Sequence, residues 1–280
     1  MSFRAATAFE TGNGAIQQSI SVCATEHFRV LDSTQTYLKN SKLEFLRSQT
    51  DCPTLVSVSA EHQTAGRGKG DRKWFSDPAN KCLALSMGFP IPVQKLGDCP
   101  ILTQFLALSV IRSVRCLPLQ MKWPNDLMLH GKKVGGILAE TEPLDDSRYA
   151  VIIGVGLNLD IDQNLLDSLV TRWPSTSLQA HCDFDINLDF FQIRDNIVQH
   201  FSKLLHDVFF TNNMESKMES LMSQISDYQF LFGQYIRFHT GSEFIEGHHR
   251  GVSPKGGLVL ETGISKFSTF YSGEIVFIDK

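Results

Sequence analysis

The sequence of 280 residues has no paired cysteines, no long hydrophobic run and no excess of positive charge. None of its six cysteines lies in a C-x-x-C pair, and no histidine spacing completes a zinc site. Scattered thiols of this kind are typical of a reducing compartment. No uninterrupted apolar run approaches the length that crosses a membrane. The formal net charge is −4, so general affinity for nucleic acid is not expected and any basic site must be local.

What remains is the composition of an ordinary globular protein, with 42% hydrophobic residues, enough for a sizeable core. Residues 1–20, rich in Gly, Gln and Thr, are predicted to be a poorly ordered lead-in. Residues 21–227 mix strand and helix patterns, whereas residues 228–280 hold only short strands separated by Gly, Ser and Thr. We therefore predict an α+β fold, a mixed β-sheet with flanking helices followed by a small β-barrel. The expected location is the cytoplasm, with a mitochondrial presequence in the lead-in as the alternative.

Apolar periodicity predicts the individual elements of this fold. Asp32 or Ser33 can cap a short helix, and the alternation in "CLALSMGF" predicts a strand with Leu83, Leu85, Met87 and Phe89 on one face. The branched run "YAVIIGVGLNL" is typical of a central strand covered on both faces. The other predicted elements are a strand in "PTLVSVSA", a buried helix in "ILTQFLALSVIRSV", strands in "LQMKW" and "LMLHGKKVGGILAE" with a turn at His130-Gly131, and an amphipathic helix from Asp189 to Phe210.

The stretch "GRGKGDRKW" concentrates glycine and positive charge in residues 66–74. A dinucleotide fingerprint would need glycine where Asp71 stands, and the chain has no Gly-Lys-Ser/Thr sequence of a P-loop. The glycines allow the backbone to approach a ligand closely, and the cations offer charge to a phosphate or carboxylate. These residues are Gly66, Gly68, Gly70, Arg67, Lys69, Arg72 and Lys73. Taken alone, the stretch is also compatible with a solvated surface loop.

Two further motifs bear on this choice. In "KWPNDL", Pro124 fixes the backbone, so that Lys122, Asn125 and Asp126 project from a rigid strand end; the alternative is a common Pro-Asn-Asp turn. In "GKKVGGILAE", the pair Gly135-Gly136 removes side chains from an apolar strand, which often marks the close approach of a ligand or backbone. The alternative there is a hairpin with exposed lysines.

Together these motifs resemble those of the biotin protein ligases, in order and spacing from about residue 30 onward. The matching stretches are "LDSTQ" (31–35), Gln63 with "GRGK" through Trp74, "KWPND" (122–126), "KVGGILAE" (133–140) and "GVGLN" (154–158). The resemblance implies a catalytic domain like that of class II aminoacyl-tRNA synthetases in residues 21–227 and an SH3-like domain in residues 228–280. It also implies a form of the family without an N-terminal DNA-binding domain, because only about thirty residues precede "LDST".

The resemblance implies a two-step reaction that uses ATP with Mg²⁺ and biotin. Biotin carboxylate attacks the α-phosphate of ATP to give biotinyl-AMP, and a lysine of a biotin carboxyl carrier domain then displaces AMP. The carriers expected are those of acetyl-CoA, propionyl-CoA or pyruvate carboxylases, with the ligase a monomer or a homodimer and without nucleic-acid or membrane partners. Both steps gather negative charge on phosphate oxygens, so fixed donors and cations are what the chemistry needs.

The implied roles divide among catalysis, biotin and ATP. The catalytic residues are Lys133, which bridges the two reacting anions, Arg67, which neutralises phosphate, and Asp126, which orients or deprotonates the acceptor lysine. The biotin-binding residues are Ser33, Thr34, Gln35, Gln63, Gly66, Arg67, Gly68, Lys69, Lys133, Gly136, Gly154 and Gly156. The ATP-binding residues are Lys69, Arg72, Trp74, Lys122, Asn125, Asn158 and Arg250, although Trp74 is equally compatible with a core position.

The chain departs from the family pattern at two of these positions. Lys69 stands where the family commonly has arginine. Lysine keeps the positive charge but cannot form the planar, bidentate hydrogen bonds of a guanidinium group. Gln35 stands where the family has asparagine. We also expect the glycine-rich loop to close over the reactive intermediate and to exclude water. The main rival function is a lipoate or octanoate ligase of the same fold, and the others are a biotin-sensing repressor and a catalytically silent binding module.

Overall fold

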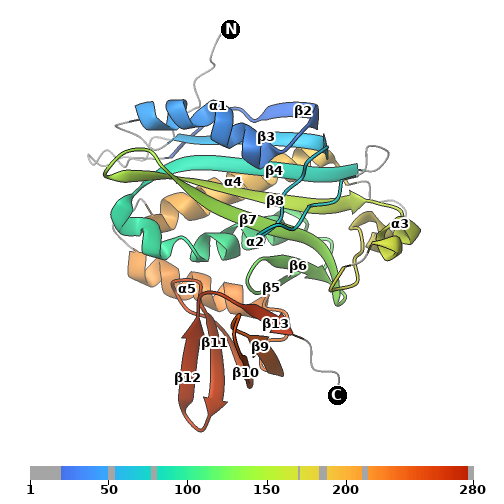
Figure 1. Cartoon of the computed structure of the whole chain (residues 1–280), viewed down its shortest axis with the longest axis vertical. Helices are drawn as coiled ribbons and strands as arrows, with labels where there is room; N and C mark the ends of the chain where they lie inside the picture. The colour runs from blue at the N-terminus through green and yellow to red at the C-terminus, as the bar shows by residue number, and fades with distance from the viewer. Residues whose placement is uncertain are drawn as a thin grey trace.

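The computed structural model describes residues 20–49, 54–76, 81–169, 171–182, 188–209 and 214–276. The predicted lead-in lies outside these ranges except for residue 20. Two β-sheets and their helices make up the molecule (Figure 1).

The larger sheet contains eight strands and carries the site discussed below. Its strands are β1 (Ser21–Val22), β2 (Glu26–Leu31), β3 (Thr54–Gln63), β4 (Lys81–Pro92), β5 (Gln120–Lys122), β6 (Asp126–Leu129), β7 (Lys132–Pro143) and β8 (Arg148–Asp160). The order is β1-β3-β4-β8-β7-β6-β5, and β2 also pairs with β3. Because β1 and β2 run parallel to β3 while the other neighbours are antiparallel, the predicted mixed sheet is confirmed.

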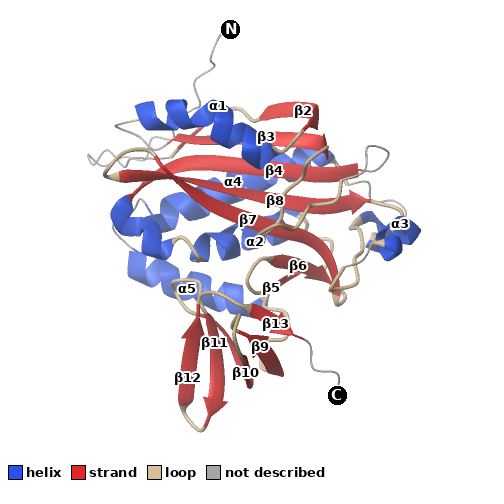
Figure 2. Cartoon of the chain, viewed as in Figure 1, coloured by secondary structure: helices blue, strands red, loops and turns tan. Residues whose placement is uncertain are grey.

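Helices cover both faces of this sheet (Figure 2). Helix α1 (Thr34–Ser48) packs on β3, β4 and β8, and Ser33 is its N-cap, accepting a hydrogen bond from the Thr36 amide. Helices α2 (Ile101–Ser113) and α4 (Phe190–Phe209) pack on each other and on the opposite face. The remaining helical segments are α3 (Gln163–Ser168), α5 (Met214–Asp227) and the 3₁₀ turns η1 (Val93–Asp98) and η2 (Gln179–His181).

Strand β4 shows how alternation assigns the two faces. Leu83, Leu85 and Met87 are fully buried in the main core with α2 and α4, as the alternation predicted. Their neighbours Ser86 and Gly88 face α1 instead, since Gly88 lies against α1 side chains. Each buried leucine contributes roughly 1.5–3 kcal/mol of hydrophobic stabilisation, so the register is firmly set. The face toward α1 is therefore the one free to carry polar groups.

The smaller sheet follows α5 and is antiparallel throughout. Its strands are β9 (Tyr235–His239), β10 (Phe244–Val252), β11 (Leu258–Gly263), β12 (Lys266–Phe270) and β13 (Glu274–Val276), in the order β12-β11-β10-β9-β13. Trp123 joins it to the larger part: the indole donates a 3.0 Å hydrogen bond to the Gly256 carbonyl and packs edge-on against Phe238.

Helix α5 ends at the predicted boundary, Asp227, but we did not predict α5 or α3 from the sequence. Among the helices of the described ranges, none combines the length and apolar character needed to span a membrane.

Candidate functional site

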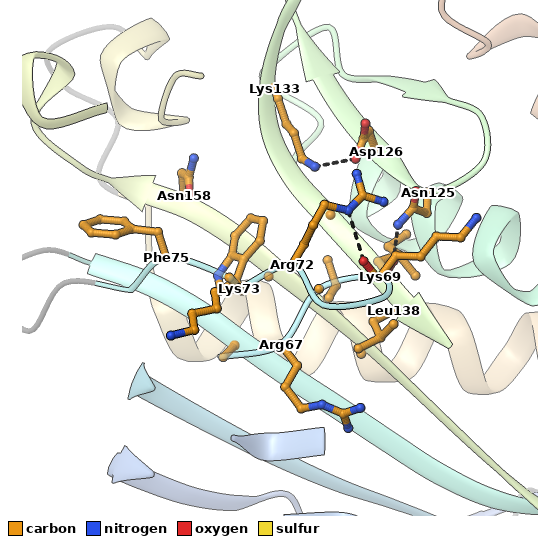
Figure 3. Close-up of a pocket in the computed structure, with 18 of the residues that line it drawn as sticks. Arg67, Lys69, Arg72, Lys73, Phe75, Asn125, Asp126, Lys133, Leu138 and Asn158 are labelled. Carbon is orange, nitrogen blue, oxygen red and sulfur yellow. Dashed lines mark hydrogen bonds and ion pairs between the residues drawn. The ribbon is translucent and has the colours of Figure 1, made fainter. Parts of the chain in front are cut away.

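A pocket of about 410 Å³ lies on the α1 face of the larger sheet, where α1 begins. Strands β4, β7 and β8 form its floor, and residues 63–75 and 171–175 form its sides (Figure 3). The smaller sheet contributes Glu274 to the rim. Most of the predicted site residues line it: Ser33, Thr34, Gln35, Gln63, Arg67, Gly68, Lys69, Arg72, Trp74, Asn125, Asp126, Lys133, Gly136, Gly154, Gly156 and Asn158.

Glycines on β7 and β8 create the space for this pocket. A Cβ atom at Gly154 would lie 2.5 Å from the Ser86 hydroxyl, and one at Gly156 would lie 2.4 Å from the indole ring of Trp74. Gly136 pairs with Gly156 across the two strands and also faces the indole. The Trp74 Nε1 donor is buried and has no hydrogen-bond partner among the residues that the structure describes. The glycines therefore admit an aromatic ring and leave one buried donor available beside the pocket.

One end of the pocket is a buried network of neutral polar side chains. The Thr34 amide donates to Gln63 Oε1 at 2.8 Å, and the Thr34 hydroxyl lies 2.8 Å from that of Ser86. Ser86 donates in turn to Gln35 Oε1 at 3.0 Å, and Gln35 Nε2 donates to the Ile152 carbonyl at 2.9 Å. All four side chains are buried. Since each group orients the next, the network presents a fixed set of donors and acceptors to a ligand.

The glycine-rich stretch forms a short hairpin over the floor. The Trp74 amide donates to the Gly66 carbonyl at 3.0 Å, and the Gly68 amide donates to the Arg72 carbonyl at 2.8 Å. Gly70 sits at the tip with φ of 66°, a left-handed conformation that favours glycine. Gly66 itself is absent from the pocket lining, because its position beside the Trp74 carbonyl is part of the hairpin's base.

Between this network and the mouth, the pocket holds a carboxylate that contacts two lysines. Lys133 Nζ lies 2.5 Å from Asp126 Oδ1, and Lys122 Nζ lies 3.5 Å from Asp126 Oδ2. Figure 3 shows Lys133 and Asp126 pointing toward each other from β7 and β6. Lys122 is fully buried and also lies over the ring of Trp173 at 4.8 Å. Burial lowers the pKa of Lys122, and the Asp126 carboxylate opposes this shift.

Some residues of the motif "KWPND" line the pocket, whereas Lys122 lies beneath it. Lys122 ends β5 and lies beneath Asp126 rather than in the pocket lining, because the β5–β6 turn directs its side chain inward. Asn125 binds β7 twice, as its side-chain amide donates to the Ile137 carbonyl at 2.7 Å and its carbonyl accepts from the Ile137 amide at 2.8 Å. On the other side, Asn158 donates to the Thr176 carbonyl at 3.0 Å. These contacts fix the strand ends that carry Asp126 and Lys133.

The mouth of the pocket is charged and exposed. Arg72 donates from Nε to the Lys69 carbonyl at 3.0 Å, and its guanidinium lies 3.9 Å from Glu274. Arg172 forms an ion pair with the same carboxylate. Glu274 therefore joins the hairpin, the segment after α3 and the smaller sheet. Such exposed pairs are individually weak and easily exchanged for a ligand.

The guanidinium groups of two predicted site residues, Arg250 and Arg67, are paired with carboxylates away from the Lys133–Asp126 pair. Arg250 is not part of the pocket lining and pairs with Glu261 within the smaller sheet, at 2.6 Å. Arg67 lines the pocket, but its guanidinium makes two hydrogen bonds with Glu140, at 2.9 and 3.0 Å. Figure 3 shows that the Arg67 side chain points away from the Lys133–Asp126 pair.

Several residues that line the pocket were not predicted from the sequence. Ser86 had a detectable signal, because it is a polar residue on the face of β4 opposite the leucines. Arg172 and Glu274 had no such signal, since only the packing of the two sheets brings them together.

The described residues include no cluster of acidic, histidine or cysteine side chains suited to hold a metal ion. Both carboxylates named at the pocket, Asp126 and Glu274, contact cations, so these residues do not fit a preformed Mg²⁺ site.

The fold and the pocket define a class of α+β protein whose pocket combines a buried neutral polar network with a cationic mouth. Comparison with known proteins makes this class more specific. Residues 27–158 match the model of the Biotin/lipoate A/B protein ligase family. The bifunctional ligase/repressor BirA of Bacillus subtilis is 30% identical over 250 residues, which cover 88% of this chain and 71% of BirA. The chain belongs to the biotin protein ligase family.

Two other relatives complete the comparison. The biotin–[acetyl-CoA-carboxylase] ligase of Mycobacterium tuberculosis is 36% identical over 110 residues, covering 37% of this chain and 39% of that protein. Among solved structures, the biotin protein ligase from Aquifex aeolicus, in complex with biotin and ATP, superposes with a TM-score of 0.64 and 23% identity. The match covers 90% of this chain and 97% of that structure. At this identity the likeness shows that the fold is shared.

Proposed function

We propose that the protein is an ATP-dependent biotin–protein ligase that forms biotinyl-AMP and transfers biotin to a lysine of a carboxylase carrier domain. The family and its named relatives support this reaction. The observation that carries the proposal is the position of Lys133. Its ammonium lies in a pocket that is neutral and hydrogen-bonding at one end and cationic at the mouth.

In the first step, a biotin carboxylate oxygen bonds to the α-phosphorus of ATP and pyrophosphate leaves. Two anions must approach each other, and their repulsion is the main barrier that this pocket can lower. The Lys133 ammonium exchanges Asp126 for the biotin carboxylate and the α-phosphate. Lys69 and Arg72, at the mouth, neutralise the phosphates that follow. Preorganised cations of this kind typically contribute about 10²–10³ in rate each.

In the second step, the ε-amine of the acceptor lysine attacks the acyl carbonyl and AMP leaves. The acceptor arrives as an ammonium and must lose a proton before it can attack. Asp126 is suited to receive it, because its carboxylate already accommodates the ammonium of Lys133 at 2.5 Å. Lys122 lies beneath it, with its Nζ 3.5 Å from the other carboxylate oxygen.

The adenine is assigned to the buried indole donor of Trp74, with Asn158 near the ribose or phosphates. Lys122 supports Asp126 from below rather than touching phosphate. Contacts of Asn125 and Arg250 with ATP, and the SH3-like character of residues 228–280, stay predictions. Mg²⁺ would enter bound to the phosphates of ATP, and none of the steps above is routed through it.

The buried network of Thr34, Gln35, Gln63 and Ser86 favours biotin over lipoate or octanoate. A ureido ring offers two donors and one carbonyl, which can satisfy buried polar groups. An aliphatic or dithiolane end offers this network no further hydrogen-bond partners, and a mismatch of this kind costs about 10⁴–10⁵ in selectivity at comparable sites.

The decisive measurement is the exchange of labelled pyrophosphate into ATP, which requires no acceptor. We expect exchange with biotin and none above background with lipoate or octanoate. Lys133→Ala should lower the exchange rate at least about 10³-fold, because the positive charge between the two anions is lost. The matched control is Lys132→Ala, whose side chain is outside the pocket lining and whose exchange rate should stay within about twofold. Exchange that persisted in Lys133→Ala would remove this lysine from its role, and exchange with lipoate alone would reassign the substrate.

A further inference from the structure

We propose that Arg67 acts as a positioning residue, by tethering the glycine-rich hairpin to strand β7 through Glu140, rather than by neutralising phosphate. This inference rests on the proposed function for its catalytic consequence. The tether itself concerns the protein without ligands and can be tested separately.

The contact between Arg67 and Glu140 has the geometry of a strong ion pair. Both terminal guanidinium nitrogens donate to the two carboxylate oxygens, at 2.9 and 3.0 Å, in the fork arrangement that fixes both distance and orientation. Burial raises the pKa of Glu140, but hydrogen bonds from Lys39 and Arg67 outweigh burial and hold the pKa below its ordinary value. The carboxylate is therefore charged and available to Arg67 at neutral pH.

Lys39 of helix α1 extends the pair into a four-residue cluster. Its ammonium lies 3.1 Å from Glu140 and 2.6 Å from Glu142, on the same strand. The cluster holds two cations and two anions, so the charge of Arg67 is compensated within it. Lys39 follows the first turn of α1 that carries Thr34 and Gln35. The hairpin is thus fastened to the helix that presents the polar network as well as to β7.

The tether completes the set of contacts that hold the hairpin. On the N-terminal side, the amides of Thr64 and Ala65 donate to the carbonyls of Leu31 and Asp32, at 2.9 and 2.8 Å. On the C-terminal side, the Trp74 ring lies on the glycine floor. Arg67 provides a side-chain link near the middle of the hairpin's first arm. Within the part of the chain that the structure describes, the other hydrogen bonds and ion pairs of residues 67–73 lie within the hairpin, apart from the exposed 3.9 Å pair of Arg72 with Glu274. That pair is far weaker than the fork.

Loss of the tether should affect binding and retention more than the chemical step. A hairpin that spends time away from β7 exposes the biotin pocket to water, so biotin binds more weakly and biotinyl-AMP escapes or hydrolyses. A phosphate-neutralising arginine would behave differently, because its charge is needed in the transition state and its loss would lower kcat.

The test is a charge swap in the full chain, with Arg67→Glu, Glu140→Arg and the double variant. For each single variant we expect the KM for biotin in pyrophosphate exchange to rise about tenfold with kcat changed less than about threefold. The adenylate released per biotinyl transfer should also rise. Hydrogen exchange of residues 64–73 without ligands should be faster. The double variant should recover part of both losses, since the ion pair can form in the reversed direction while Lys39 then meets a like charge at position 140.

Two controls make the outcomes distinguishable. Arg67→Lys keeps the charge but loses the fork, so it should fall between wild type and Arg67→Glu. Arg237→Glu reverses an exposed pair of the smaller sheet and should leave the KM for biotin unchanged. A kcat that fell about tenfold or more in Arg67→Glu and stayed as low in the double variant would overturn the proposal and assign Arg67 to phosphate. Unaltered hydrogen exchange in the single variants would overturn it as well. Absence of biotin-dependent exchange in the wild-type protein would instead refute the proposed function, and the hydrogen-exchange comparison would still decide the tether.

Discussion

The two ends of the pocket recognise ligands by different physical means. The inner end consists of neutral side chains that are buried and mutually hydrogen-bonded, such as Gln35 and Ser86. The mouth consists of charged side chains in water, with Arg72 61% and Arg172 48% exposed. Between them, Asp126 and the buried Lys122 are almost removed from water.

This difference in burial predicts which substitutions should most weaken ligand binding or stability. A buried group that loses its partner bears the full cost of desolvation, whereas an exposed cation loses only a screened attraction. The inner end can therefore discriminate between ligands, and the mouth can attract and release polyanions rapidly. Substitutions at the buried charges and at the inner end should therefore have larger effects than substitutions at the mouth.

Asp126→Asn should destabilise the fold by about 3 kcal/mol, because it leaves the Lys122 ammonium buried without a carboxylate. The free energy of unfolding in urea would show this loss. Asp160→Asn, at an exposed pair with Lys81, is the matched control and should change stability by less than about 0.5 kcal/mol. The double variant Asp126→Asn/Lys122→Met should regain most of the loss. Equal stability of the two single variants would mean that burial does not govern these charges.

Lowering the pH should destabilise the protein through His249 of β10, a second fully buried base. Burial lowers the pKa of His249 to about 4, from 6.5 in the unfolded chain. The unfolded state thus binds more protons below pH 6.5, and stability present above that pH is lost as the pH falls toward 4. Between about pH 7.5 and 5 the loss from this group is about 2 kcal/mol. Since a His249→Phe variant differs from the natural chain only at this position, its stability should fall by about 2 kcal/mol less over this pH range. Parallel curves of stability against pH would contradict the assignment.

Gly154→Ala should raise the KM for biotin about tenfold, equivalent to about 1.4 kcal/mol. The new methyl group would lie 2.5 Å from the Ser86 hydroxyl and 2.9 Å from Gln35 Oε1, so the buried network must shift. The KM for ATP should stay within about twofold, because the mouth is untouched. Gly97→Ala, where a Cβ meets nothing within 4 Å, is the control. A larger change in the KM for ATP than for biotin would reverse the assignment of the two ends.

Arg172→Ala should raise the KM for ATP by only about threefold, or roughly 0.7 kcal/mol, and less at high salt. Its guanidinium is half exposed and shares Glu274 with Arg72, which remains. Steady-state exchange at two ionic strengths would measure the effect, with the exposed Lys266→Ala of β12 as the control. A salt-independent loss of about tenfold or more would place Arg172 among the buried, ligand-specific groups instead.

Much of the fold followed from local pattern. Alternation in β4, the turn at His130-Gly131 and the Ser33 cap all appear as predicted, because each depends on neighbours within a few residues. Helix α5 was missed although Met218, Leu221 and Ile225 follow helical spacing, with Leu221 and Ile225 buried. The motifs also brought most candidate residues to one pocket. Spacing along the chain did not reveal the partners of those residues, and Arg67 and Arg250 are the clearest cases.

Local sequence pattern specifies most of the elements of this protein and supplies the glycines and cations from which its pocket is built. Periodicity and backbone preference act over a few residues, so the linear pattern is sufficient to specify them. The partners of the charged side chains, in contrast, are set by tertiary packing. Lys122 lies under Asp126, Arg67 turns to Glu140, and Glu274 reaches the mouth from the smaller sheet. Electrostatic energies depend on distance and burial, and both are fixed only when strands far apart in sequence pack together.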